Sequence, residues 1–186
     1  MKYISRVGIT LAVICFVAAL SLALVNAITS PRIAAYEQQV IQDALMEVAG
    51  RYELGSEEIQ SDDQAISGIH SLVDQDGSFA GYILQLQGIG YGGVMSVMAS
   101  YTLDGTVIAA RLLANSETPG LGKKAENPSY MEKFTTTGGS EPVPVKKEML
   151  PKSEADAIGG ATVTFSGIAK SIAYGSDYVK ALGGTL

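Results

Sequence analysis

The chain has 186 residues and a formal net charge of −6, from 19 acidic and 13 basic side chains. This length accommodates one ordinary domain plus a short appendage, and the acidic balance opposes binding to nucleic acid, whose phosphates would repel the chain. The single cysteine, Cys15, and the single histidine, His70, exclude a disulfide framework, a Cys/His metal site and the cysteine ligands of an iron–sulfur cluster.

An apolar run from Val7 to Ile28 contains no charged residue. In a helix its roughly 22 residues would cross about 30 Å of hydrocarbon. A cleaved secretory signal would need small residues at its end, and Leu24 is too large for such a site, so the run favours an uncleaved anchor. Lys2 and Arg6 precede the run and only Arg32 follows closely. The positive-inside rule therefore predicts a single-pass protein with a cytoplasmic N-terminus and an extracytoplasmic remainder.

The anchor and its N-terminal flank occupy residues 1–28. The segment that follows has Ser30-Pro31 near its start. Serine caps helices well, and proline suits the first helical turn because its missing N–H would be unpaired there. Apolar residues then recur at the spacing of a helix, at Ile33, Tyr36, Val40, Ala44 and Val48. Gly50 is a suitable stop, and the polar residues 53–64 predict a linker or an exposed loop. We therefore expect residues 29–65 to form a connecting helix and loop.

Two hairpins are predicted next. The first has a turn at residues 74–77, and the second has Asp104-Gly105 between its strands, which is the stronger signal because glycine accepts the backbone angles of tight hairpin turns. The expected strands are residues 69–73, 79–86, 94–103 and 106–113.

Helical signals dominate the C-terminal part. Asn127-Pro128 is expected to start a short helix that runs to Phe134, and residues 142–145 read as an edge strand or an extended loop. Ile168, Ile172, Val179 and Leu182 lie along a C-terminal helix that Gly183-Gly184 would close. The chain is therefore expected to be of the α+β class, with a single domain over residues 66–186 whose mixed, largely antiparallel sheet is flanked by helices.

Gly88 to Gly93 formally satisfies the G-x-G-x-x-G pattern of dinucleotide-binding loops. That interpretation requires a helix after the glycines and an acidic residue about 20 positions further on. A strand-like segment follows instead, and Leu112-Leu113 stand at that distance. The remaining interpretations are a bulged or bent connection between strands, or a loop whose backbone closely approaches a ligand.

The loop from Glu117 to Lys124 has the residues of a tight turn, in which Pro119 presets one backbone angle and Gly120 permits a positive φ. It is not a phosphate-binding P-loop, because no glycine stands at the required spacing before Gly122-Lys123. It is either a plain surface turn or a binding loop. The loop combines a carboxylate, a hydroxyl, free backbone N–H groups and two lysines, a mixture that suits a ring system edged with hydrogen-bonding atoms.

The segment from Asp156 to Ser166 is rich in small residues that leave Thr162 open to a bulky group. Thr164 or Ser166 is expected to cap the helix that follows, and capping hydroxyls beside a glycine-rich turn would by themselves account for the pattern. The unpaired N–H groups at a helix start also favour an anion by about 0.3–1 kcal/mol at an exposed terminus. A phosphate attached at or near Thr162 would lie in that field.

Asp156 to Thr162 resembles the flavinylation motif Asp-x-x-Ser/Thr-Gly-Ala-Thr, which is read by FMN transferases of the ApbE type. Residues 117–122, Glu-Thr-Pro-Gly-Leu-Gly, resemble a stretch of the same FMN-binding domains, and residues 91–93 followed by two strands fit in the same order. With the anchor, these motifs cover nearly the whole chain. They are similar to the RnfG and NqrC subunits of ion-pumping respiratory complexes, and the compact length is closer to RnfG. Gly159 departs from the motif, which usually has Ser or Thr there.

The resemblance implies a role for each matching residue. Thr162 would carry FMN through a phosphoester bond, and Asp156 would belong to the sequence that the transferase reads. Leu121 would contact the flavin ring face. The other cofactor-binding residues implied are Glu117, Thr118, Gly122, Gly160 and Ala161, with Lys124, Thr164 and Ser166 as weaker candidates for phosphate contact. No catalytic acid–base residue and no metal ligand is implied, because FMN performs the redox chemistry.

The function implied is that of an electron-carrier subunit with covalent FMN in the inner membrane. Its partners would be the other membrane and peripheral subunits of an Rnf-type complex, which couples electron transfer between ferredoxin and NAD to Na⁺ or H⁺ translocation, and an ApbE-type transferase for maturation. The single apolar helix has no charge and so cannot itself be the ion path. Two alternatives stay open: an NqrC-like or other flavinylated extracytoplasmic reductase component, and a non-redox anchored binding or assembly domain.

Overall fold

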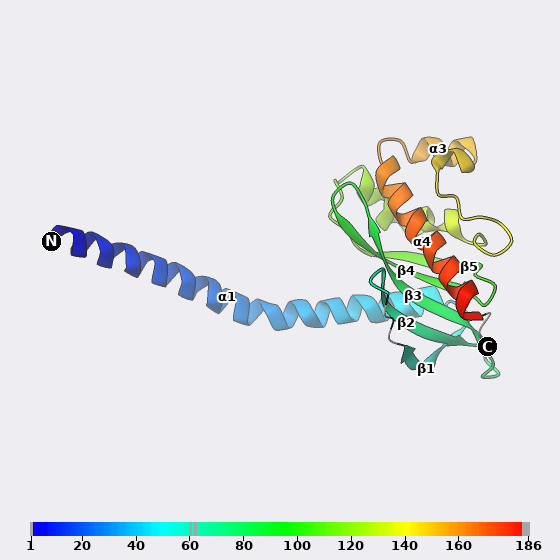
Figure 1. Cartoon of the computed structure of the whole chain (residues 1–186), viewed down its shortest axis with the longest axis horizontal. Helices are drawn as coiled ribbons and strands as arrows, with labels where there is room; N and C mark the ends of the chain where they lie inside the picture. Colours follow the sequence, from blue (N-terminus) through cyan, green and yellow to red (C-terminus); the bar gives the residue numbers. More distant parts are fainter. Residues whose placement is uncertain (1, 60, 62, 184–186) are drawn as a thin grey trace. The chain divides into compact units, whose positions relative to one another are not determined.

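The computed structural model describes residues 2–59, 61 and 63–183. The chain divides into two units between Ile41 and Gln42, upstream of the domain start expected at residue 66. The first unit consists of most of helix α1 (Lys2–Ala49), and the second holds the sheet and every other element (Figure 1). Within the described residues, α1 is the one helix long and apolar enough to cross a membrane, and its apolar stretch is not buried in the chain.

Helix α1 is continuous from the apolar run to Ala49, so the prediction of a new helix capped by Ser30 is wrong. Pro31 lies inside the helix, where it lacks the N–H that would bond the preceding turn. The strong helical pattern on both sides overrides this local loss. Within the apolar run the Ser21 hydroxyl donates to the Val17 carbonyl at 2.8 Å, so it presents no unpaired donor to its surroundings. Gly50 ends the helix with a φ of +59°, as predicted.

The second unit is built on a five-stranded sheet in the order β1-β2-β3-β4-β5, with every neighbouring pair antiparallel. The strands are β1 (Glu53–Ile59), β2 (Ile66–Val73), β3 (Phe79–Ile89), β4 (Val94–Thr102) and β5 (Val107–Ala114). Both predicted hairpins are confirmed. The predicted loop over residues 53–64 is wrong for β1, because an edge strand needs only one backbone partner and little apolar surface.

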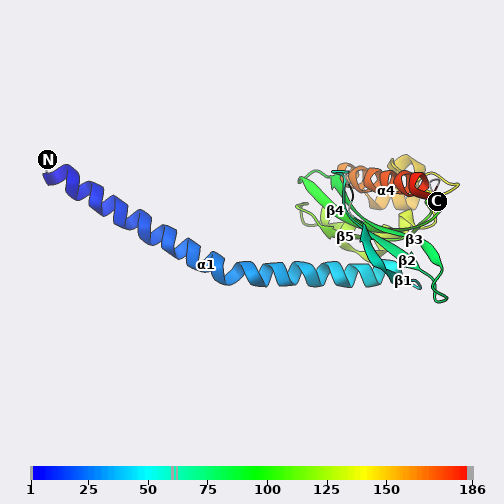
Figure 2. The same ribbon diagram turned by 60° about the horizontal axis from the view of Figure 1, so that its bottom comes forward.

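The sheet is covered on both faces, as two neighbours on β4 demonstrate. Side chains of successive strand residues point to opposite faces. The Ser100 hydroxyl donates to the Val48 carbonyl at the end of α1 at 2.6 Å, whereas the buried Tyr101 hydroxyl donates to the Ile172 carbonyl of α4 (Thr162–Gly183) at 3.0 Å. The last turns of α1 therefore cover one face, and α4 lies along the other (Figure 2).

The connection from β5 to α4 contains only short elements. They are η1 (Gly122–Glu126), α2 (Pro128–Met131), η2 (Glu132–Phe134), η3 (Lys147–Met149) and α3 (Lys152–Ala157). Asn127 caps α2 through a 3.1 Å bond from the Ser129 N–H, so the short helix expected from Asn127-Pro128 is confirmed. Residues 142–145 form a loop, the second of the two alternatives. The C-terminal helix is confirmed to Gly183, and Gly184 lies outside the described residues.

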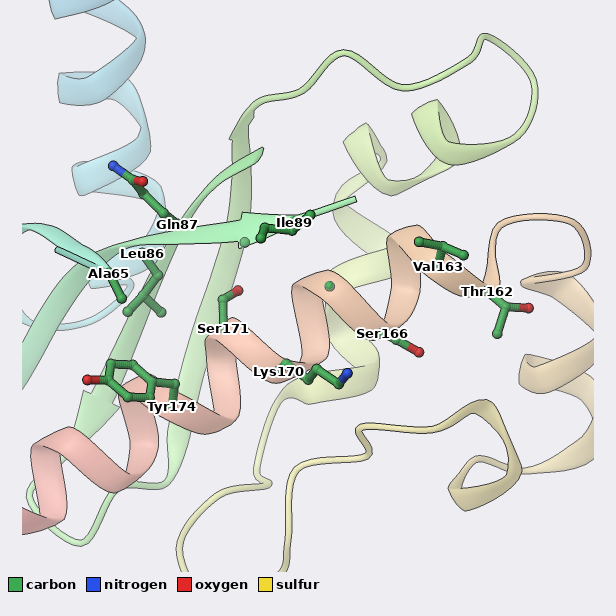
Figure 3. A pocket seen from close by; sticks show the side chains of 12 residues that line it. Ala65, Leu86, Gln87, Ile89, Thr162, Val163, Ser166, Lys170, Ser171 and Tyr174 are labelled. Atoms are coloured by element: carbon green, nitrogen blue, oxygen red, sulfur yellow. The ribbon is translucent and has the colours of Figure 1, made fainter. Parts of the chain in front are cut away.

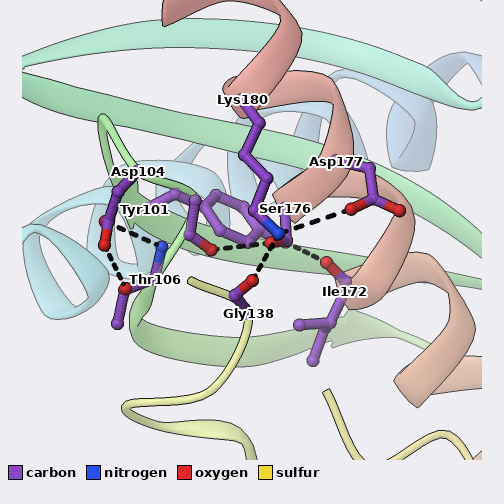
Figure 4. A network of polar contacts seen from close by, with 9 residues as sticks. Tyr101, Asp104, Thr106, Gly138, Ile172, Ser176, Asp177 and Lys180 are labelled. Carbon is purple, nitrogen blue, oxygen red and sulfur yellow. Dashed lines mark hydrogen bonds and ion pairs between the residues drawn. The ribbon is translucent and has the colours of Figure 1, made fainter. Parts of the chain in front are cut away.

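Polar bonds fasten the C-terminal part of α4 to the β4–β5 turn and to the loop near Gly138 (Figure 4). The Ser176 hydroxyl donates to the Gly105 carbonyl at 2.7 Å, and the Lys180 ammonium donates to the Gly138 carbonyl at 2.5 Å. The Asp104 carboxylate accepts bonds from the Thr102 hydroxyl and from the N–H and hydroxyl of Thr106. These donors, the Thr102 hydroxyl most of all, lower the pKa of Asp104. The apolar core lies between this helix and the sheet, where the Phe134 and Phe165 rings stack with centroids 5.5 Å apart. These bonds therefore hold the C-terminal part of α4, and the buried Phe165 ring holds the helix near Thr162.

Candidate functional site

Thr162 is the first residue of α4 and is exposed. The chain reaches it through a tight turn in which the Ala161 N–H bonds the Ile158 carbonyl at 2.9 Å. Ile158 and Ala161 are buried and anchor the turn. Gly160 has a φ of +85°, which favours glycine, and an added Cβ would lie 3.0 Å from the Leu121 side chain, which would have to shift slightly. The turn thus presents the Thr162 hydroxyl at the surface.

The Glu117 loop folds as its sequence predicts. Pro119 and Gly120 occupy the centre of a turn closed by a 3.2 Å bond from the Leu121 N–H to the Thr118 carbonyl, and Gly120 has a φ of +81°. The turn leaves the Leu121 side chain 44% exposed beside Gly160. Two distant glycine-rich segments of the chain therefore meet at this point.

The Glu117 carboxylate connects these two segments to the third glycine-rich segment, Gly88 to Gly93. Its side chain is only 4% exposed. One oxygen, Oε1, accepts the Gly92 N–H at 3.0 Å, and the other, Oε2, accepts the buried Thr164 hydroxyl at 2.7 Å. Among the described residues the carboxylate has no cationic partner, so these bonds are what stabilise its buried charge. Glu117 thus ties the β3–β4 turn and the start of α4 to its own loop.

Glycines allow this close approach. A Cβ on Gly92 would lie 2.1 Å from the Ser116 carbonyl oxygen, and one on Gly122 would lie 2.3 Å from Glu117 Oε2. The Gly90 N–H bonds the Gly93 carbonyl at 2.8 Å, which makes the segment a turn between two strands rather than a dinucleotide-binding loop. The interpretation as a bent connection between strands is therefore confirmed, and the groups that approach its backbone are Ser116 and Glu117 of the same chain.

A cleft of about 370 Å³ opens where these segments meet, within the 300–1,000 Å³ typical of ligand sites. Eight of the residues predicted to bind the cofactor or to belong to its attachment motif line it. These are Glu117, Thr118, Leu121, Gly122, Gly160, Ala161, Thr162 and Thr164. Tyr91 and Val163 line it as well, although no role was predicted for either. The available signal was their position in the sequence, since Val163 follows Thr162 directly and Tyr91 belongs to the glycine-rich stretch 91–93.

Three other predicted residues lie outside this cleft. Lys124 is exposed on η1, and Asp156 is exposed in the last turn of α3. Ser166 lines a different groove. The expectation that Thr164 or Ser166 caps α4 is wrong, because the helix already begins at Thr162 and both lie within it. Thr164 uses its hydroxyl to hold Glu117 instead.

The second groove, of about 620 Å³, lies along the first turns of α4 (Figure 3). Its walls are α4 and the end of β3, and Thr162 and Val163 line it together with the first cleft. We refer to the two as the Glu117 cleft and the Lys170 groove. The remaining lining residues of the groove are Ala65, Leu86, Gln87, Gly88, Ile89, Ser166, Gly167, Lys170, Ser171 and Tyr174.

The Glu117 cleft has the features that a phosphate-linked flavin requires. The first helical bond of α4 runs from the Phe165 N–H to the Ala161 carbonyl, so the N–H groups of residues 162–164 have no helical partner and face the helix start. These donors and the helix dipole favour a phosphate on Thr162. Leu121 and Tyr91 offer apolar surface to a ring. The residues present therefore fit FMN.

Comparison with known proteins agrees with this geometry. The model of an FMN-binding domain matches residues 90–176, and that of the RnfG N-terminal region matches residues 1–48. The G subunit of the ion-translocating oxidoreductase complex of Methanosarcina acetivorans is 27% identical, over 97% of this chain and 96% of its own. The protein of the same name from Cereibacter sphaeroides is 30% identical, over 84% of this chain and 75% of its own.

A third relative is the G subunit of the proton-translocating ferredoxin:NAD(+) oxidoreductase complex of Clostridium ljungdahlii. It is 28% identical, over 87% of this chain and 84% of its own. The matches extend from the apolar helix through the Glu117 cleft and into α4. The chain belongs to the RnfG family, the G subunits of ion-translocating oxidoreductase complexes.

Proposed function

We propose that this chain is the membrane-anchored electron carrier of an Rnf-type complex, with FMN joined by a phosphoester bond to Thr162 Oγ1. The complex would pass electrons between reduced ferredoxin and NAD and couple this transfer to Na⁺ or H⁺ translocation. The names of the relatives support this proposal. The observation that carries it is the exposed Thr162 hydroxyl at the start of α4, in the wall of a cleft lined by the predicted flavin contacts.

Bound FMN would supply the redox chemistry, and the chain's own residues would hold and orient it. The unpaired N–H groups at the start of α4 would face the phosphate. Leu121 and Tyr91 would pack against the ring, while Gly122 and Gly160 would let the backbone come close to it. Glu117 would keep the cleft walls together through its bonds to Gly92 and Thr164.

The anchor would place this carrier outside the cytoplasm. Lys2 and Arg6 before the apolar run support a cytoplasmic N-terminus in the inner membrane. A carrier in that compartment benefits from covalent attachment, because a lost free cofactor would not be replenished there. The apolar run from Val7 to Ile28 has no charge, so other subunits would have to supply the ion path. An ApbE-type transferase would attach the FMN.

The proposal is tested on the full-length protein purified from membranes of a host that has the transferase. After denaturation and electrophoresis the band should fluoresce as a flavin, and peptide mapping should locate an FMN-sized mass on the peptide that contains Thr162. Thr162→Val should lose both signals. Thr118→Val should keep both, since it removes another exposed hydroxyl of the same cleft. A protein without covalent flavin, made in such a host, would refute the carrier mechanism and favour a non-redox binding domain.

A further inference from the structure

The Lys170 groove has no role in the function proposed above, although it begins at the same threonine. Thr162 and Val163 line both hollows, so a group attached to Thr162 Oγ1 can enter either one by rotation about its own tether. Thr162 is exposed, and neither side of the helix start closes over it. Thr162 therefore borders both hollows and stays accessible from each.

The groove has apolar surface without a partner at the end next to Thr162. Ile89, at the end of β3, is 76% exposed, and Val163 in the first turn of α4 is 54% exposed. Large aliphatic side chains exposed together beside a concave surface mark a binding site more often than isolated ones do. Leu86 forms the buried floor, and Tyr174 adds an aromatic ring at the far end (Figure 3). A flat, mostly apolar ring fits between these walls.

Polar groups of the groove suit the hydrogen-bonding edge of a flavin. Ser166 and Lys170 follow Thr162 at steps of four residues, which places them on one side of α4. Lys170 is about 12 Å along the helix axis from Thr162 at 1.5 Å per residue, and its side chain runs back along the helix in Figure 3. Lys170 forms no ion pair with any described residue. Together with the Ser166 hydroxyl it offers donors to ring carbonyl oxygens.

We propose that the Lys170 groove is a second seat for the ring of the Thr162-linked flavin, which alternates between this groove and the Glu117 cleft. This inference rests on the proposed function, because it requires FMN on Thr162. The ring would contact Leu121 and Tyr91 in one seat and Ile89 and Val163 in the other. A carrier whose ring has two seats can present it in either hollow without any movement of the domain.

The test uses nuclear magnetic resonance of the full-length flavinylated protein in detergent micelles, with labelled isoleucine, leucine and valine methyl groups. The unflavinylated Thr162→Val protein provides the reference spectrum. Ring-current shifts are expected at the methyl signals of both Leu121 and Ile89, because the ring spends time over each. The mass of the Thr162 peptide is measured on the same sample, so flavin content is known independently of ring position.

Lys170→Glu should then lower the shift at Ile89 at least twofold and raise the shift at Leu121, since a carboxylate repels the carbonyl edge of the ring. Lys146→Glu is the matched control: it makes the same charge change at an exposed lysine outside both hollows, and should leave both shifts unchanged. A shift confined to Leu121, or an equal effect of the two variants, would overturn the second seat while leaving the proposed function intact. Absence of the flavin mass would overturn both.

Discussion

At the scale of single residues, Glu117 holds the site together. It lies 47 positions before its partner Thr164, and it also accepts the Gly92 N–H across the β3–β4 turn. The sequence resemblance assigns Glu117 to the flavin contacts, and the geometry adds a structural task. Both carboxylate oxygens are already engaged by the protein, so Glu117 positions the walls of the cleft as well as lining it.

We expect Glu117→Ala to lower the free energy of unfolding by about 1–3 kcal/mol, because it leaves the buried Thr164 hydroxyl without its acceptor. Urea titration of the full chain in detergent micelles, followed by far-ultraviolet circular dichroism, measures this change. Glu141→Ala is the control, since Glu141 is exposed and its side chain lines neither hollow. Equal stability of the two variants would show that the carboxylate does not fasten the cleft.

Two buried tyrosines offer a matched comparison. The Tyr101 hydroxyl donates to the Ile172 carbonyl at 3.0 Å, whereas the buried Tyr130 hydroxyl has no partner among the described residues. Tyr101→Phe should therefore cost about 1 kcal/mol of unfolding free energy, and Tyr130→Phe should cost nothing or stabilise slightly. The same urea titration compares them. A larger loss for Tyr130→Phe would mean that its hydroxyl is hydrogen-bonded in solution.

Alkaline pH tests Tyr130 in another way. Burial raises the pKa of Tyr130 to about 12, above the value near 10 of an unfolded chain. The folded state then binds the proton more tightly, so the contribution to stability is fully present below about pH 10 and is lost as the pH rises toward about 12. We expect Tyr130→Phe to flatten the fall in unfolding free energy over that window. An unchanged slope in the variant would contradict this assignment.

At the scale of elements, the turn between α3 and α4 decides how Thr162 is presented. Gly160 has a positive φ and lies against Leu121, so Gly160→Ala should destabilise the turn by about 1–2 kcal/mol. Gly159 has no positive φ, and an added Cβ would lie 3.1 Å from the Asp156 carbonyl oxygen. Gly159→Ser, which restores the residue usual in the motif, should need only a small local adjustment and should keep flavin attachment.

Mass measurement of the Thr162 peptide, with unfolding curves beside it, separates the two substitutions at this turn. Gly160→Ala should reduce both stability and flavin content, while Gly159→Ser should reduce neither. If Gly159→Ser abolished the flavin mass, glycine at this position would be a requirement of this chain rather than a tolerated departure from the motif.

Some of the helices and strands could be predicted from the sequence, and others could not. The β4–β5 hairpin was predictable because Asp104-Gly105 encodes its turn locally. Strand β1 was missed because an edge strand pairs through its backbone with one neighbour and has little apolar pattern. The helix start at Ser30-Pro31 was misplaced because proline usually marks a first turn, whereas here the helical pattern on both sides continues the helix through Pro31 despite its local cost.

The candidate site also has features that were predictable from the sequence and features that were not. The sequence motifs predicted most residues that line the Glu117 cleft, because the turn at Gly120 and the start of α4 are determined by residues close together in the sequence. The bond from Thr164 to Glu117 and the Lys170 groove could not be predicted, because both depend on how α4 packs across the end of β3. No local pattern in the chain specifies that packing.

At the scale of the whole molecule, the last turns of α1 belong to the soluble fold. Ala44, Leu45, Val48 and Ala49 are buried in the unit that holds the sheet. A chain shortened to begin at residue 34 should therefore fold, and one that begins at residue 51 should not. Burial of one Leu or Val side chain contributes about 1.5–3 kcal/mol, so the second chain loses a large share of a typical domain's stability. Amide hydrogen exchange of the two chains would distinguish them, and equal protection would refute this role.

The order of the strands has a consequence for synthesis. Each strand pairs with its neighbour in sequence, so the sheet can assemble progressively while the chain is still being made. Thr162, the proposed acceptor, begins α4, and its surroundings are complete only when that helix packs and the Thr164 hydroxyl reaches Glu117. Under the proposed function, FMN attachment would therefore have to follow the synthesis and packing of α4, and a chain truncated before α4 would not display a finished acceptor.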